Sequence, residues 1–82
     1  MDVSIQIPEL GAIATRADII NNHTDVPNMR MTICIGLFND AGDRLNVFTV
    51  DHTLTGFPVP SADEQWQIVA PVLAEMQKAN PV

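Results

Sequence analysis

The sequence predicts an α+β fold, in which a small antiparallel sheet is built around a central β-hairpin and a C-terminal helix packs on one face. Two apolar, β-branched runs flank a short polar segment in the middle of the chain, which is typical of a hairpin. Apolar and polar residues alternate near the N-terminus, which indicates at least one further strand. Near the C-terminus, apolar residues at helical spacing follow a capping sequence.

The hairpin is expected to pair residues 29–38 with residues 44–52. Asn39 or Asp40 can begin the turn through its side chain, and Gly42 can adopt the positive φ that follows. If the loop holds five residues, Phe38 lies opposite Arg44. The pairs that follow from this register are Leu37–Leu45, Ile35–Val47, Ile33–Thr49 and Met31–Asp51.

This register divides the hairpin side chains between two faces. The first face is apolar over most of its length, and we expect the helix to cover it. The second face is mixed, and its apolar members are Cys34, Phe38, Phe48 and Val50. A slip of one residue would exchange the faces of one strand, so the assignment depends on the length of the loop.

The N-terminal strand has a period of two. Val3, Ile5 and Ile7 alternate with polar residues, and Pro8 ends the run. Because proline removes a backbone donor, this strand is expected to lie at an edge of the sheet or to finish at Pro8.

Residues 9–22 fit two structures. Their apolar residues include a set at helical spacing, Leu10, Ile13, Ala17 and Ile20. The same stretch also reads as a half-buried strand, and we favour a strand over residues 15–21 with the helix as the alternative. The polar residues 21–28 are interpreted as a connection.

A helix is expected over about residues 62–79. Ser61 and Glu64 have the spacing of a capping box, which satisfies backbone donors at a helix start. The apolar stripe of this helix consists of Trp66, Val69, Val72, Leu73 and Met76. Pro71 interrupts the pattern and predicts a kink, because it removes one helical hydrogen bond.

The chain is expected to be a single domain over residues 1–82, and a domain of this size has a marginal core. Its one cysteine, Cys34, cannot form an internal disulfide, and no Cys/His spacing suggests structural zinc. One helix covers one face of a sheet, which leaves the second hairpin face to the N-terminal segment or to another subunit. We therefore expect self-association to complete the burial.

The charge balance disfavours two classes of partner. Ten acidic residues against four basic ones give a net charge of −6. Such a chain lacks a basic surface for phosphates, which disfavours direct binding to nucleic acid or to an anionic membrane. The N-terminus lacks the basic region of a secretory signal, and no apolar run approaches the ~18 residues of a spanning helix. Together with the lone cysteine, this predicts a reducing, cytoplasmic location.

No catalytic, metal or cofactor site is predicted. Imidazole and carboxylate groups are close in sequence at His23 and Asp25 and again at Asp51 and His52. Adjacent strand residues point to opposite faces, so these groups are better explained as solvated side chains in a loop and at a strand end. Cys34 lies inside a predicted strand, where an inert packed thiol is the usual case. The sequence thus favours a protein that is not an enzyme.

The function that these features favour is a structural or assembly module, which self-associates or packs into a larger particle such as a ring or a virion. Its interface candidates are apolar residues of the second hairpin face, the N-terminal strand and the helix: Cys34, Phe38, Phe48, Val50, Val3, Ile5 and Trp66. For Trp66, a place in the core is the alternative, and is favoured.

A second hypothesis is an acidic inhibitor, whose carboxylates fill the basic groove of a nucleic-acid-processing protein. This function requires acidic residues of the hairpin loop and of the helix start to gather on one surface. The residues concerned are Asp40, Asp43, Asp63 and Glu64.

Overall fold

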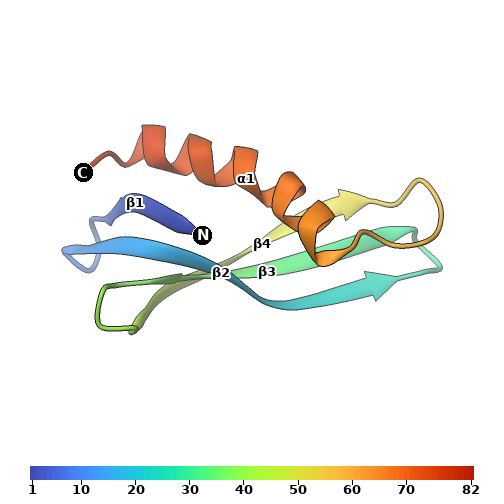
Figure 1. The fold of residues 1–82 in the computed structure, drawn as a ribbon, viewed down its shortest axis with the longest axis horizontal. Coiled ribbons are helices and arrows are strands. Elements are labelled where there is room, and N and C mark those ends of the chain that lie inside the picture. The colour runs from blue at the N-terminus through green and yellow to red at the C-terminus, as the bar shows by residue number, and fades with distance from the viewer.

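The computed structural model describes all 82 residues and contains a four-stranded antiparallel sheet followed by one helix (Figure 1). The strands lie in the order β1-β2-β3-β4, so each is the neighbour of the next in sequence. Their bounds, with those of the helix, are β1 (Asp2–Ile7), β2 (Ala12–Asp25), β3 (Arg30–Phe38), β4 (Arg44–Thr53) and α1 (Ala62–Ala79). The predicted α+β class, with a C-terminal helix packed on an antiparallel sheet, is confirmed.

The turn between β3 and β4 forms as its residues predict. Gly42 has a φ of 85°, and its N–H donates to the carbonyl oxygen of Asn39 at 3.0 Å. The side-chain oxygen of Asn39 accepts from the N–H of Asp43 at 2.9 Å. Phe38 pairs with Arg44, as the five-residue loop requires.

Beyond this pair the predicted register is wrong. It shifts between Phe38 and Leu37, so that Leu37 lies opposite Asn46. One extra residue in β4, Leu45, forms a β-bulge there, and such a residue is left without a cross-strand partner. The pairs that this bulge overturns are Leu37–Leu45, Ile35–Val47, Ile33–Thr49 and Met31–Asp51.

Because of the bulge, the side chains of β4 from Asn46 onward point to the opposite face of the sheet from the one predicted. Phe48 now lies opposite Ile35, and Val50 lies opposite Ile33. Because directly opposed residues share a face, Phe48 and Val50 are on the side that α1 covers. Their predicted place on the second face, beside Cys34, is therefore wrong.

β2 is longer than predicted. The favoured strand over residues 15–21 is present and extends to 12–25, and the alternative helix over 9–22 is wrong. Residues 21–25 pair with β3, so the connection that we expected over 21–28 is reduced to a turn over residues 26–29. The register between β2 and β3 also shifts between Ile19 and Asn21, where Ile20 has no partner. The alternation of β2 side chains between the two faces is therefore interrupted at Ile20.

α1 begins where the capping box predicts. The Ser61 hydroxyl accepts from the N–H of Glu64 at 3.3 Å, and the Glu64 carboxylate accepts from the N–H of Ser61 at 3.2 Å. The buried side chain of Gln65 donates to the Pro60 carbonyl oxygen and accepts from the Asn22 side chain, both at 3.2 Å. The bond to Asn22 attaches the helix start to β2. The helix includes Pro71, and the kink expected there stays a prediction.

The core lies between α1 and one face of the sheet. It contains twelve buried apolar residues, among them Ile33, Ile35 and Leu37 of β3, which have no exposed surface. Val3 and Ile5 of β1 are 8% and 1% exposed and belong to this core. These two were expected as interface candidates. The apolar side of β1 thus packs within the chain.

Candidate functional site

The face of β2, β3 and β4 that points away from α1 has no covering element (Figure 1). Because strand side chains alternate, residues between the buried positions of β3 must point to this side. We name it the open face. Its apolar and uncharged members are Ile13, Ile20, Thr32, Cys34, Gly36, Phe38, Val47 and Thr49, and its charged or strongly polar members are Arg16, Asp18, Asn21, His23, Asp25, Arg30, Arg44 and Asp51.

Phe38 is the largest side chain of the open face, and its ring folds back over Gly36. A Cβ atom at Gly36 would lie 2.9 Å from the Phe38 ring and 3.3 Å from Cγ2 of Ile20. The Arg16 guanidinium carbon lies 5.0 Å from the ring centroid, and its Nε is 2.9 Å from the Asp18 carboxylate. This cation–π contact covers part of the ring and leaves Phe38 half-buried.

The apolar part of the open face crosses all three strands. Ile13 and Ile20 of β2 are 44% and 41% exposed, and Val47 of β4 is 40% exposed. Cys34 lies between β2 and β4 and is half-buried. Single exposed aliphatic residues are ordinary on a protein surface, but an apolar group gathered on one face marks a candidate contact surface.

The far end of the open face is polar. Asp51 accepts a hydrogen bond from the Thr32 hydroxyl at 3.0 Å, and His23 lies opposite Thr32 on the other side. The Asn28 side-chain amide donates to the Asp25 carboxylate at 2.7 Å, and this bond is the main cause that lowers the pKa of Asp25. These groups form a polar rim at this end of the open face.

The histidines do not converge. His23 faces the open side of β2, whereas His52 lies opposite Met31 on the side that α1 covers. A single metal ion cannot be reached from both faces of a sheet. The structure contains no group of three or more His, Cys, Asp or Glu side chains placed to hold a metal ion.

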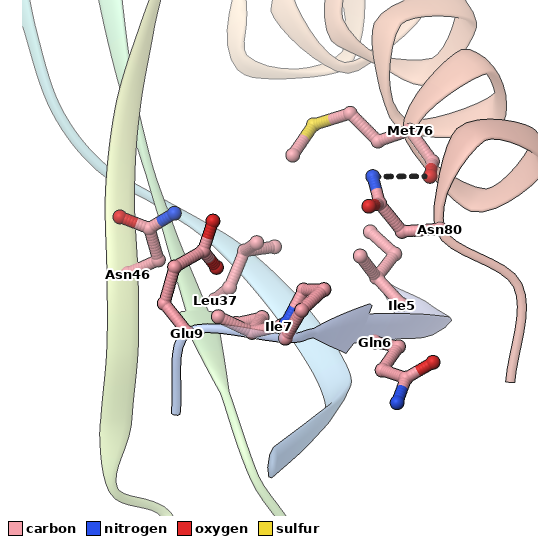
Figure 2. A pocket seen from close by; sticks show the side chains of 9 residues that line it. Ile5, Gln6, Ile7, Glu9, Leu37, Asn46, Met76 and Asn80 are labelled. Carbon is pink, nitrogen blue, oxygen red and sulfur yellow. Dashed lines mark hydrogen bonds between the residues drawn. The ribbon is translucent and has the colours of Figure 1, made fainter. Parts of the chain in front are cut away.

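A small cavity lies under the C-terminal end of α1 (Figure 2). It encloses about 140 Å³, with Ile5, Ile7 and Leu37 on its apolar side and Glu9 and Asn46 at its polar side. Pockets for small-molecule ligands are typically about 300–1,000 Å³. One carboxylate with a few amides in so small a space does not form a set of catalytic groups.

Trp66 lies on the side of the sheet that faces α1, away from the open face. It is half-buried and packs against the core from α1. Its remaining surface lines a shallow depression with Met1, Asp18 and Ala70. Trp66 thus packs partly on the core and partly faces this depression.

Of the residues expected at an interface, Cys34 and Phe38 lie together on the open face. Phe48, Val50 and Trp66 are on the helix side, and Val3 and Ile5 are in the core. Ile20 and Val47, which the sequence reasoning missed as interface residues, join Cys34 and Phe38 because of the two bulges. One signal in the sequence indicated the bulge in β2. Ile19 and Ile20 are adjacent apolar residues, which breaks the alternation expected of a strand with one buried face.

The helix α1 does not have the combination of length and apolar sequence that a helix needs to traverse a membrane. Comparisons of the chain with protein-family models, with curated proteins and with solved structures gave no match.

Proposed function

We propose that this chain is a non-enzymatic assembly subunit that self-associates through the open face of its sheet. The observation that carries the proposal is the apolar group of Ile20, Cys34, Phe38 and Val47, which no element of the chain covers (Figure 1). Sheets of this kind bury an apolar face against a second layer, and a second copy supplies such a layer at about 10 Å spacing.

The size of the domain favours this arrangement. The chain has 82 residues, a free cysteine and a core on one side only of its sheet. Apolar surface removed from water contributes about 25 cal/mol per Å². Covering the open face would therefore add burial that a chain this small does not achieve alone.

The charges of the open face are compatible with a second copy, although the net charge of −6 opposes self-association. Arg16 and Arg44 lie opposite Phe38 at one end of this face, and Asp25 and Asp51 lie toward the other end. A two-fold axis that crosses the strands near Cys34 reverses this order. Arg16 and Arg44 of one copy then lie over Asp25 and Asp51 of the other, and these contacts favour that orientation, although Asp18 beside Arg16 and Arg30 beside Asp25 offset part of the charge at each end.

The arrangement of acidic residues does not favour the inhibitor hypothesis. The loop that carries Asp40 and Asp43 lies at one end of the molecule, and the helix start with Asp63 and Glu64 lies toward the other (Figure 1). The single acidic surface that this function requires is therefore not formed. A ring or a virion in which the chain repeats, within a reducing cytoplasm, remains our proposed setting.

Light scattering coupled to size-exclusion chromatography tests the proposal. We expect the chain to elute above its monomer mass of 9.0 kDa at about 100 µM. The substitution Ile20→Lys places a charge in the apolar group and should shift the protein to the monomer. Val26→Lys makes a comparable change at a residue that is 51% exposed in the β2–β3 turn, and should leave the mass unchanged.

A monomeric wild-type protein at about 100 µM would overturn the proposal. So would equal effects of Ile20→Lys and Val26→Lys, because both variants add one charge to the chain. Circular dichroism of each variant checks that the change in mass does not come from unfolding.

A further inference from the structure

We infer that β4 pairs antiparallel with β4 of a second copy, so that the sheet continues from one molecule into the next. This inference rests on the proposed function, since it takes the neighbour to be another copy of the chain. It uses the outward backbone groups of β4 at the free edge of the sheet, whereas the side chains of the same residues, Val47, Thr49 and Asp51, belong to the open face.

The edge at β1 is already closed. The N–H of Gln6 donates to the Asn80 carbonyl oxygen at 3.0 Å, and the N–H of Ser4 donates to the Gln77 side chain at 2.8 Å. The end of α1 thus takes the place of a fifth strand along β1. Edge strands that are satisfied in this way do not accept a further strand.

The outer edge of β2, beyond the end of β1, is irregular. The bulge between Ile19 and Asn21 interrupts it, and the Asn21 side chain accepts from the N–H of Asn22 at 2.9 Å. Bulges and local side-chain bonds of this type prevent edge-to-edge pairing.

Over its C-terminal half, the edge at β4 is neither bonded to the end of α1, as β1 is, nor interrupted by a bulge, as β2 is. Residues 46–53 pair with β3 in one unbroken register. The N–H of Leu54 donates to the Met29 carbonyl oxygen at 2.7 Å, which fixes the alternation of the ladder. The backbone groups of Val47, Thr49, Asp51 and Thr53 therefore point away from β3. Of these donors, the N–H of Val47 alone has a side-chain partner, Asn46 at 2.8 Å.

One register of the two β4 strands uses the free N–H groups of Thr49 and Asp51. It leaves intact the hydrogen bond from the N–H of Val47 to the Asn46 side chain. With Thr49 on a two-fold axis, its N–H donates to the carbonyl oxygen of Thr49 of the second copy, and the reverse bond forms as well. The N–H of Asp51 then donates to the carbonyl oxygen of Val47 of the second copy, again twice. On the helix side, Phe48 lies opposite Val50 of the second copy, which is a favourable apolar pair.

The charges along β4 select this orientation. Arg44 begins the strand and Asp51 lies near its end. Because the bulge at Leu45 shifts the ladder by one residue, Arg44 takes the place opposite Thr53 of the second copy. Asp51 of that copy then lies on the diagonal from Arg44, where oppositely charged side chains attract. A parallel pair would set Asp51 against Asp51. The local pairs of opposite charge offset part of the repulsion between two chains of net charge −6.

Two distinct two-fold contacts on one chain have a structural consequence. If the open face and the β4 edge each engage a neighbour, every copy contacts two others, and the assembly grows past a dimer into a closed ring or an open polymer.

The substitution Thr49→Pro tests the edge contact. Proline removes the outward N–H that the second copy requires, and proline is tolerated on an edge strand because the β3 ladder does not use that donor. We expect wild-type protein to exceed the dimer mass at about 100 µM and Thr49→Pro to stop at the dimer. Thr49→Ala keeps the N–H and should behave as wild type, and Ile20→Lys combined with Thr49→Pro should give monomers.

Hydrogen exchange provides a test that needs no substitution. The amides of Thr49 and Asp51 should exchange at least about 10-fold more slowly at 100 µM than at 1 µM protein, because the second copy protects them. Equal exchange at both concentrations would overturn the edge contact, even if Thr49→Pro fails to fold. A wild-type dimer that Thr49→Pro leaves intact and Ile20→Lys dissociates would also overturn it, with the proposed function standing. A wild-type monomer would overturn both.

Discussion

The two faces of β3 differ more than their sequences suggest. Ile33, Ile35 and Leu37 have no exposed surface, whereas Cys34 and Phe38, which alternate with them, are only half-buried. Both sets are apolar, and the difference arises because the single helix α1 can cover one side of the sheet. Folding of the chain therefore depends mainly on the helix side. The open face remains available to a neighbour.

The largest expected effect on stability comes from truncating a side chain to alanine on each face of β3 and comparing the two losses. Ile35→Ala should lower the free energy of unfolding by about 3 kcal/mol, because the buried side chain leaves a cavity under α1. Cys34→Ala, one residue away, should cost below about 1 kcal/mol in the monomer. Urea denaturation of dilute protein measures both. Similar losses at the two positions would contradict the one-sided core.

A smaller effect is expected within the open face. In Gly36→Ala the new Cβ would lie 2.9 Å from the Phe38 ring, so the ring must move away from its contact with Arg16. We expect a loss of about 1 kcal/mol in the free energy of unfolding.

A double-mutant cycle with Phe38→Leu identifies the cause of that loss. Leucine is smaller than the ring that occupies this space, so Gly36→Ala should cost less in the Phe38→Leu background. An equal cost in both backgrounds would show that the ring does not limit the space over Gly36.

The smallest effect lies at the polar rim. The Asn28 side chain holds the pKa of Asp25 below its usual 3.8, since its amide donates to the carboxylate. A lowered pKa means that the unfolded chain binds the proton more readily. This contribution to stability is therefore present above pH 3.8 and is lost as the pH falls through the folded pKa. In Asn28→Ala the pKa of Asp25 should rise toward 3.8, as a carbon-detected NMR titration measures, and an unchanged pKa would contradict this cause.

The features with a local chemical cause could be predicted from the sequence. Gly42 adopts its positive φ in the expected turn, and the Ser61–Glu64 capping box forms at the helix start. In both places the deciding groups lie within three or four residues of each other, so the sequence contains the whole interaction.

The faces of β4 could not be predicted, because one bulge decides them. Leu45 looks like an ordinary strand residue, and nothing in its side chain signals that it lacks a partner in the ladder. The end of β2 was missed for another reason. Residues 21–25 are all polar, and they are held in the strand by pairing with β3 and by the bond between Asn22 and Gln65. Long-range contacts of that kind leave no periodic pattern.

The most direct test of the central claim uses Cys34 as a reporter of the open face. Its thiol lies among the residues that a second copy would cover, and it is the only thiol in the chain. We predict that iodoacetamide modifies Cys34 at least about 10-fold more slowly at 100 µM than at 1 µM protein, and that Ile20→Lys abolishes this difference. A modification rate that is the same at both concentrations would show that no neighbour covers the open face, and would contradict the account.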